Sequence, residues 1–343
     1  MTTHIYKPVF TAKRLFFSPA VTDNFTSIDN SKLNLEPWWV TGFTDGEGCF
    51  SISIIRNKKC KLGWEIKLSF SFSLHKKDKA RALRLFSKGT FEKILENIQS
   101  YFGVGSINTK HGPQTIKYYV QSIKDLAIII DHFERCPLIT QKRADYELFK
   151  QVFYLILKKE HLTIDGLHKI VAIKASINKG LSSELKVAFP LITPVQRPKV
   201  EEILIHDPYW FLGFVEAEGC FSVMILKSQT IKTGFSVSLR FQLTQHSQDI
   251  ALMQNLRNFW DCGNIIEDSK QPIVDFKINK FSDIHGKVIP FFQKYPIMGV
   301  KCFDYLDFCK VAELMQNKVH LTQEGIDEIK KIKSRMNTGR NFD

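Results

Sequence analysis

Two stretches of the chain alternate apolar and polar residues with a period of two. They cover residues 64–75 and 235–246 and lie 171 positions apart (235 minus 64). Such alternation is typical of a β-strand that buries one face and exposes the other. In the first stretch, the side chains that we expect to be buried are Ile66, Leu68, Phe70 and Phe72.

Longer segments with helical composition also occur in pairs. Residues 141–159 match 300–318, and each is followed by His-Leu-Thr and a second amphipathic segment, near 163–178 and 322–336. Each half is therefore predicted to contain a helix, two strands, a helix, two strands and two further helices. The apolar run 126–130 is expected to be the core of a strand or a helix, because it is too short to span a membrane.

The boundaries of the two halves follow from the repeat and from the positions of proline. Residues 187–206 contain three prolines and a charged stretch, which is typical of a linker. We therefore predict a first half over residues 31–186 and a second half over residues 207–343.

Two segments stand outside the repeat. Residues 97–102 match 255–260 at an offset of only 158, which leaves 13 extra residues in the first half (171 minus 158). This insertion is predicted near residues 80–93, as a loop or a helix extension. Residues 1–30 contain three basic residues and no acid before Asp23, so they are predicted to be a transit peptide or a poorly ordered extension.

The most specific feature is a short sequence that occurs twice. WVTGFTDGEGCFS (residues 39–51) returns as WFLGFVEAEGCFS (residues 210–222), again at an offset of 171 (210 minus 39). Each copy is an apolar, helix-like run that ends in two acids and a glycine. Because glycine is a common helix stop, each run is predicted to end at this glycine.

Small residues recur four positions apart in each run. They are Gly42 and Gly46 in the first copy, and Gly213 and Ala217 in the second. Small side chains at this spacing share one face of a helix and let a second helix approach closely. We therefore expect the two runs to pack against each other.

The acids at the ends of these helices are candidate metal ligands. If the helices pack together, their terminal carboxylates converge, and converging carboxylates repel unless a cation lies between them. Asp45 and Glu47 are two residues apart and point in different directions on a helix. We predict Glu47 and Glu218 as the ligands, with Asp45 and Glu216 in supporting roles; the alternative is that these acids are simply exposed at helix ends.

Composition narrows the class of protein. The chain has 343 residues, of which 44% are hydrophobic, so it is large enough for two globular units. A formal net charge of +13 favours a polyanionic partner such as nucleic acid, although a basic protein without such a partner would share it. The seven cysteines include no C-x-x-C pair and have no zinc-ligand spacing with histidine, so reduced thiols are expected.

The two motifs and their flanks resemble the LAGLIDADG homing endonucleases, in particular the single-chain type with two motifs found in fungal mitochondrial introns. The resemblance covers the chain from about Lys32 to the C-terminus. It implies an α+β fold of two pseudo-symmetric αββαββα halves, in which antiparallel sheets form a saddle over duplex DNA and the motif helices lie at the centre. It also implies a monomeric, mitochondrial, site-specific endonuclease that cuts both strands of a long asymmetric DNA target.

The resemblance also implies roles for individual residues. Glu47 and Glu218, with Gly46 and Ala217 as further metal contacts, would bind Mg²⁺, and Mn²⁺ or Ca²⁺ could occupy the same site. Further candidates for the active site are Lys142, Lys301, Gln242 and Lys277. The lysines would stabilise developing charge, and Gln242 takes the place of a polar amide on the second strand. The alternative for each lysine is a solvated helix face or a simple phosphate anchor. Two counterparts differ between the halves: Ser71 matches Gln242, and Tyr119 matches Lys277.

Polar residues on the strands and in the loops after each motif are predicted to contact DNA. Their residue types suit base edges and phosphates, although an ordinary solvent-facing sheet would show similar alternation. The predicted set is Ser51, Ser53, Asn57, Lys59, Lys61, Lys67, Ser69, Ser71 and Ser73 in the first half, and Ser222, Lys227, Ser228, Lys232, Ser236, Ser238, Arg240, Thr244 and Lys277 in the second.

Two other functions are compatible with the same resemblance. The chain could be an RNA maturase that assists splicing of its own intron, or a DNA-binding protein without catalysis. Intact acids in both motifs favour the nuclease, because RNA binding alone does not require them. Arrangements of Ser/His/Asp or Cys/His do not recur in both halves, which disfavours a covalent mechanism.

Overall fold

The computed structural model describes residues 35–75, 90–108, 115–201 and 204–339. The predicted extension over residues 1–30 and most of the predicted insertion near 80–93 lie outside these ranges. Only residues 90–93 of the insertion are described, where they begin a helix.

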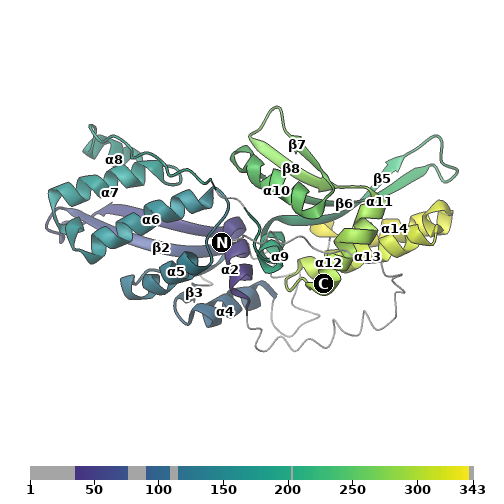
Figure 1. Ribbon diagram of the computed structural model, residues 1–343, viewed down its shortest axis with the longest axis horizontal. Helices are drawn as coiled ribbons and strands as arrows, with labels where there is room; N and C mark the ends of the chain where they lie inside the picture. Colours follow the sequence, from purple (N-terminus) through teal and green to yellow (C-terminus); the bar gives the residue numbers. More distant parts are fainter. Residues whose placement is uncertain (1–34, 76–89, 109–114, 202–203, 340–343) are drawn as a thin grey trace, which may run out of the picture.

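The first half is built around one four-stranded antiparallel sheet (Figure 1). The strand order is β1-β2-β4-β3. Its elements in chain order are α2 (Pro37–Glu47), β1 (Gly48–Arg56), β2 (Trp64–His75), α4 (Thr90–Phe102), β3 (Ser106–Asn108), β4 (Thr115–Val120), α5 (Ile123–Arg135), α6 (Lys142–Leu157), η2 (Glu160–Leu162), α7 (Ile164–Ser176) and α8 (Ser183–Ala188).

The second half repeats this topology with the strand order β5-β6-β8-β7. Its elements are α9 (Pro208–Glu218), β5 (Gly219–Lys227), β6 (Phe235–His246), η3 (Ser247–Asp249), α10 (Ile250–Trp260), β7 (Asn264–Glu267), β8 (Ile273–Ile278), α11 (Phe281–Asp283), η4 (Ile284–Val288), α12 (Ile289–Lys294), α13 (Lys301–Gln316), η5 (Val319–Leu321), α14 (Gln323–Ser334) and η6 (Asn337–Gly339). The expected αββαββα halves are confirmed.

One helical segment in each half was absent from the element order predicted from the sequence. In the first half it is α5, which contains the apolar run 126–130, and in the second half it is α11–η4–α12. In α5, Leu126, Ile129, Ile130 and Phe133 are buried at helical spacing. The run is a helix because these side chains form a stripe that packs on the sheet.

Each sheet buries one face against the helices that follow it. Phe50 of β1 contacts Phe133 of α5 and Phe149 of α6, with ring centroids 5.5 and 5.4 Å apart. The equivalent Phe221 of β5 contacts Phe292 of α12 and Phe308 of α13 at 5.3 and 5.4 Å. The predicted buried face of β2 is confirmed, because Leu68, Phe70 and Phe72 are at most 2% exposed and Ile66 is partly buried.

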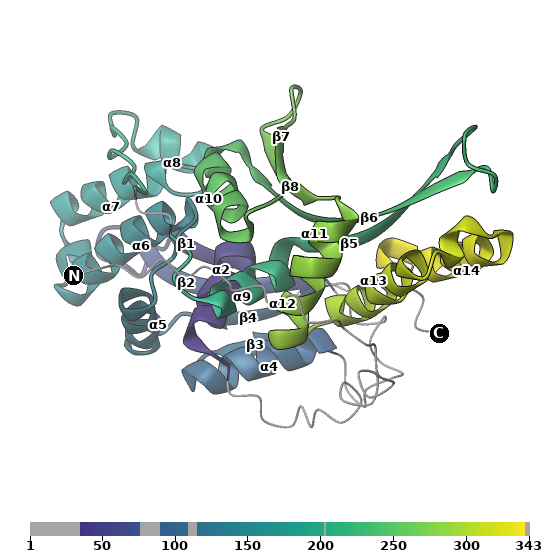
Figure 2. The ribbon, with the colours of Figure 1, turned by 45° about the vertical axis from the view of Figure 1, so that its right-hand side comes forward.

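The two motif helices, α2 and α9, pack side by side at the centre of the molecule (Figure 2). A Cβ atom on Gly42 would overlap the carbonyl oxygen of Trp210, and one on Gly213 would overlap that of Trp39. A Cβ atom on Gly46 would overlap the Cβ of Ala217. The predicted close approach is therefore confirmed, and it is a contact between backbones.

Each motif helix ends at the predicted glycine. Gly48 and Gly219 have φ values of −70°, so they are not left-handed caps, and a strand begins at each of them. A Cβ atom on Gly48 would lie 2.8 Å from the carbonyl oxygen of Thr44, and the same holds for Gly219 and Val215. The glycines are needed because the chain turns back closely over the last helical turn.

Within the described ranges, no helix combines the length and the apolar character that crossing a membrane requires.

Candidate active site

The packing of α2 against α9 brings the last residues of the two motifs together. Glu47 and Glu218 are the final residues of these helices. A Cβ atom on Gly46 would lie only 3.5 Å from Oε1 of Glu218, so the Glu218 carboxylate lies beside the end of α2. Glu47 lines a cavity of about 400 Å³ together with Ala217 and Lys301 of the other half.

Asp45 is buried and holds the segment that precedes α6. It is 3% exposed, and its carboxylate accepts hydrogen bonds from the backbone N–H groups of Ile139 (3.1 Å) and Thr140 (3.2 Å). It also accepts from the Thr140 hydroxyl at 2.6 Å and from Nε1 of Trp210 at 2.8 Å. Burial raises the pKa of Asp45, and these hydrogen bonds oppose the increase.

Glu216 has the equivalent place in the second half. It is 5% exposed, and its Oε1 accepts from the backbone N–H of Gly299 at 2.8 Å and from that of Met298. Burial raises the pKa of Glu216 as well. The carboxylates of Asp45 and Glu216 therefore bind the backbone that precedes each lysine.

Lys142 and Lys301 reach back to the ends of the motif helices. Nζ of Lys142 donates to the carbonyl oxygens of Thr44 (2.9 Å) and Gly46 (2.7 Å). Nζ of Lys301 donates to those of Val215 (3.2 Å) and Ala217 (2.7 Å) in the same manner. Each ammonium group thus binds carbonyl oxygens in the last turn of a helix, at the negative end of its dipole.

These contacts place two positive charges next to the two terminal carboxylates. Desolvation lowers the pKa of both lysines, while nearby acids, including Glu47 and Glu218 in each case, act to raise it. The repeat identified the two lysines as equivalent, but their role as caps became visible only in the tertiary structure.

The donor set suits a hard divalent cation. Within the described part of the chain, no group of three or more His, Cys, Asp or Glu residues is placed to hold a metal ion. Two carboxylates and the carbonyl oxygens of Gly46 and Ala217 are all oxygen donors, which Mg²⁺ and Ca²⁺ prefer. Each of these carbonyls already accepts a hydrogen bond from a lysine and keeps one further lone pair. Mg²⁺ commonly binds through one or two carboxylates and completes its shell with water and phosphate, so the residues fit such an ion.

Gln242 belongs to a hydrogen-bonded group on the polar face of the second sheet. Its Nε2 donates to Thr244 Oγ1 and to Asp275 Oδ1, both at 3.0 Å. Thr244 donates to Asp275 at 2.6 Å, and Lys277 forms an ion pair with Asp275 at 2.7 Å. Burial acts to raise the pKa of Asp275, but Lys277 and Thr244 outweigh it and hold the pKa below its usual range.

Asp275 was missed in the sequence, although a signal was present. Residues 273–278 alternate, which puts Asp275 on the same face as the predicted Lys277. In the first half the equivalent position is Lys117, so the two sheets differ in charge at this place.

Ser71 does not fit its prediction as a DNA contact. It lies on the predicted face but is only 4% exposed, because it sits between Cys49 of β1 and Tyr119 of β4 and its side chain is short. The first half therefore offers no accessible counterpart of Gln242 at this position.

The other residues predicted to contact DNA are exposed or partly exposed, but the hydroxyl of Ser69 is buried and has no hydrogen-bond partner among the described residues, so it does not fit its prediction either. Asn57, Lys59 and Lys61 lie at the β1–β2 turn, while Lys227, Ser228 and Lys232 lie at the β5–β6 turn, which extends away from the centre in Figure 1. The remaining members, placed on the strands, are Ser51, Ser53, Lys67, Ser69, Ser73, Ser222, Ser236, Ser238, Arg240, Thr244 and Lys277.

Glu65 is the acid on the polar face of the first sheet, and it too is paired. It accepts from Asn57 Nδ2 at 3.0 Å and lies 3.1 Å from Nζ of Lys67. Asn57 and Lys67 are therefore already oriented in the absence of a partner.

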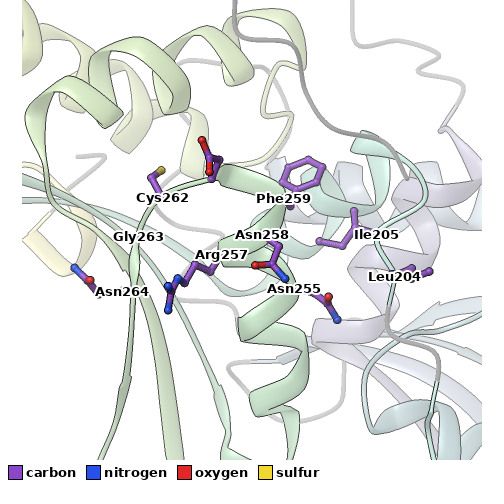
Figure 3. Close-up of a pocket in the computed structure, with 10 residues that line it drawn as sticks. Leu204, Ile205, Asn255, Arg257, Asn258, Phe259, Cys262, Gly263 and Asn264 are labelled. Carbon is purple, nitrogen blue, oxygen red and sulfur yellow. The ribbon is translucent and has the colours of Figure 1, made fainter. Parts of the chain in front are cut away.

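A second cavity lies away from the motif glutamates. It has a volume of about 740 Å³ and lies at the end of α10, where Asn255, Arg257 and Asn258 face it (Figure 3). Leu204 and Ile205, from the chain that precedes α9, close another side. It contains neither Glu47 nor Glu218, so we do not assign the reaction to it.

Comparison with known proteins agrees with this architecture. The family model described as LAGLIDADG endonuclease matches residues 40–153 and 211–312. The probable intron-encoded endonuclease 3 of Neurospora crassa is 44% identical over 302 residues, which cover 88% of this chain and 54% of that protein. The probable intron-encoded endonuclease 2 of the same organism is 36% identical, with coverages of 88% and 65%. The chain thus spans between half and two thirds of the length of these relatives.

Solved structures with the same fold include DNA complexes. I-SmaMI, a LAGLIDADG homing endonuclease bound to cleaved DNA, is 47% identical with a TM-score of 0.82, and the match covers 89% of this chain and 98% of that one. I-SmaMI bound to uncleaved target in the presence of calcium ions is 46% identical, with a TM-score of 0.82 and coverages of 89% and 100%. Its single and double lysine-to-alanine variants have also been solved, at 45–46% identity. The two motif helices, the paired sheets and these matches together show that the chain belongs to the LAGLIDADG endonuclease family.

Proposed function

We propose that this chain is a site-specific endonuclease that hydrolyses phosphodiester bonds in both strands of a long, asymmetric DNA duplex with the help of a divalent metal. The observation that carries the proposal is the meeting of Glu47 and Glu218 at the ends of two packed helices, with one partly buried lysine beside each end. Two copies of the same arrangement match two strands to be cut.

The rest of the molecule supports a DNA substrate. The chain carries a net charge of +13, and the polar faces and turns of both sheets present Ser, Asn, Lys and Arg side chains. On these faces the acids Glu65 and Asp275 are each paired with a lysine. Similar proteins have been solved on DNA targets.

The chemistry divides between the metal and the side chains. Mg²⁺, when bound by Glu47 and Glu218 with the carbonyls of Gly46 and Ala217, would activate water and neutralise charge on the leaving oxygen. Lys142 and Lys301 place fixed positive charge beside the same point, where it stabilises negative charge that develops on the phosphate. In the second half, Gln242 and Lys277 offer polar groups held in place by Asp275.

The spacing of the lysines gives independent support. The two lysines replaced in the I-SmaMI variants lie 159 positions apart in that protein. Lys142 and Lys301 are also 159 positions apart (301 minus 142). We infer that they are the equivalent pair.

The experiment is a cleavage assay on a library of random duplexes with Mg²⁺, followed by sequencing of the cut products. The wild type should cut one defined site, while Glu47→Gln and Glu218→Gln should bind that site in Ca²⁺ yet cut at least about 100-fold more slowly, because each loses a carboxylate that holds the metal. Glu328→Gln, which changes an exposed glutamate on α14, is the matched control and should cut normally.

Two results would overturn the proposal. One is full double-strand cutting by either glutamine variant. The other is a wild type that binds DNA but never cuts it, which would favour the non-catalytic DNA-binding protein. Acceleration of splicing of its own intron without DNA cleavage would favour the RNA maturase instead.

We also propose the organisation that goes with this function. The first half spans residues 31–186 and the second 207–343, with 187–206 as the linker. A single chain then supplies both halves as a monomer, and its place is the mitochondrion, where introns of the ND4 and Cox1 genes encode similar proteins.

A further inference from the structure

The backbone of Gln141, the residue immediately before Lys142, is held on both sides, at its N–H and at its carbonyl oxygen. Oδ1 of Asp249 accepts a hydrogen bond from the backbone N–H of Gln141 at 2.8 Å. Nη2 of Arg197 donates to the carbonyl oxygen of Gln141 at 3.0 Å. Asp249 belongs to the second half of the molecule, and Arg197 belongs to the segment that joins the halves.

This contact completes the start of α6. The backbone N–H groups of Ile139 and Thr140 bind Asp45 of the first half, and the next N–H, that of Gln141, binds Asp249 of the second half. Such groups at the beginning of a helix have no partner inside the helix, and a carboxylate is a favourable acceptor there. Asp249 is 6% exposed, so water cannot easily replace it.

Arg197 also fixes the first turn of α6. Its Nη1 donates to Oδ1 of Asp145 at 2.5 Å and to the carbonyl oxygen of Ser176, at the end of α7, at 3.2 Å. The guanidinium group thus joins Gln141, Asp145 and Ser176 through donors of fixed relative geometry.

We propose that Asp249 and Arg197 are positioning residues that place Lys142 against the end of α2, so that one of the two active centres is complete only when the linker and the second half are docked on the first. The inference rests on the proposed endonuclease function. Nζ of Lys142 must stay within reach of the carbonyls of Thr44 and Gly46, and the backbone at Gln141 sets where its side chain starts. A small displacement there moves the ammonium group away from the reacting phosphate.

The effect is confined to one centre. Lys301 is carried by a segment that Glu216 holds through Met298 and Gly299, and neither Asp249 nor Arg197 takes part in those bonds. Loss of Asp249 or Arg197 should therefore slow cleavage of one strand and leave the other almost unchanged.

Protonation offers a second readout. Burial raises the pKa of Asp249 to about 6; the bond from Gln141 lowers it, the charge of Asp45 raises it, and Lys142 and His246 lower it. Above this pH the carboxylate is ionised and is a strong acceptor for Gln141. Below it the carboxyl group is protonated and is a weaker acceptor. Cleavage of the DNA strand that depends on Lys142 should then slow relative to cleavage of the other strand.

The test uses the full chain and a duplex that carries the site recovered from the random library, with a different fluorophore on each strand. Lys142→Ala and Lys301→Ala first identify which strand depends on which lysine. In single-turnover reactions with Mg²⁺, Asp249→Asn and Arg197→Ala should cut the Lys142-dependent strand about 10- to 100-fold more slowly and the other strand less than twofold more slowly. Nicked duplex should accumulate.

The matched control is Asp307→Asn, which removes another buried aspartate; Asp307 is bonded to Arg335 and lies on α13, six positions after Lys301 (307 minus 301). It should cut both strands as the wild type does. Binding of the duplex in Ca²⁺ should be unchanged in all variants. The Tm of Asp249→Asn should not decrease, because the substitution removes a buried charge.

We compare the cleavage rate of the Lys142-dependent strand with that of the other strand. In the wild type this ratio should decrease at pH values below about 6, and in Asp249→Asn it should stay constant. Equal slowing of both strands, or a strand ratio that still falls with pH in Asp249→Asn, would overturn the inference while leaving the endonuclease assignment intact. A wild type that cuts no duplex would overturn the assignment itself.

Discussion

At the scale of single residues, the two halves make the same contact with different side chains, between the buried acid of the motif and the segment that precedes the lysine. Asp45 and Thr140 in the first half correspond to Glu216 and Gly299 in the second. The longer acid faces the smaller partner: a Cβ atom on Gly299 would lie 2.5 Å from Oε2 of Glu216. The longer acid is thus paired with the smaller residue in one half, and the shorter acid with the larger residue in the other.

Gly299→Thr should therefore destabilise the protein by about 1–3 kcal/mol through overpacking against Glu216. Glu216→Asp in the same chain should recover most of the loss, because it recreates the pair found in the first half. Urea unfolding of the two single variants and the double variant gives the coupling energy. Strictly additive effects would contradict the steric explanation.

His132 predicts how stability responds to acid. It is 1% exposed and hydrogen-bonds the hydroxyls of Thr41 (3.1 Å) and Tyr101 (3.0 Å). Burial, with help from Arg135, lowers its pKa to about 3. The unfolded chain binds a proton near pH 6.5 and the folded chain does not, so this contribution to stability is present above pH 6.5 and is lost as the pH falls towards 3.

Below pH 6.5, protonation of His132 in the unfolded chain should lower the free energy of unfolding by up to about 1.4 kcal/mol for each pH unit. His132→Gln keeps polar atoms at this place but does not titrate, so its unfolding free energy should fall less between pH 7 and pH 5 than that of the wild type. Parallel decreases in the two proteins would show that other groups control the response.

At the scale of elements, the contact between α2 and α9 decides whether an active centre forms. The helices meet through backbone atoms at Gly42 and Gly213, and the glutamates follow five residues later (47 minus 42, and 218 minus 213). A methyl group at either glycine must push the helices apart and, with them, the two carboxylates.

Gly42→Ala and Gly213→Ala should each cost about 1–3 kcal/mol or more of unfolding free energy and should abolish cleavage. Gly286→Ala is the matched control, since a Cβ atom there would meet no other atom within 4 Å. It should be neutral or slightly stabilising. Thermal unfolding measures the loss of stability in these variants, and the cleavage assay measures the loss of activity. Full activity of Gly42→Ala would show that the close approach of the helices is not required.

At the scale of the whole molecule, the symmetry is that of the backbone more than of the surface. The strand orders β1-β2-β4-β3 and β5-β6-β8-β7 are equivalent. On their polar faces, however, Ser71, Lys117 and Tyr119 correspond to Gln242, Asp275 and Lys277. In the function proposed above, such faces would present different chemistry to the two ends of a duplex, as the proposed asymmetric target requires.

Much of this was predictable from local patterns. The alternation of apolar and polar residues predicted β2 and β6 and their buried faces. The small residues at matching positions of the two motifs predicted the contact of α2 with α9. The helix α5 was not recognised, because a short apolar run within 126–130 fits a strand and a helix equally well, and only packing on the sheet distinguishes them.

The sequence by itself determined the duplication, the two motif helices and the identity of their terminal acids, since these depend on residue type and spacing along the chain. The tertiary structure alone decided that Lys142 and Lys301 cap those helices, that Ser71 is covered, and that Asp249 of one half holds Gln141 of the other. The hydrogen bonds among these contacts join residues that are 84 to 108 positions apart in the chain, the longest being that from Gln141 to Asp249 (249 minus 141). No periodicity of neighbouring residues encodes them, because they arise only when packing of the two halves brings distant backbone and charge together.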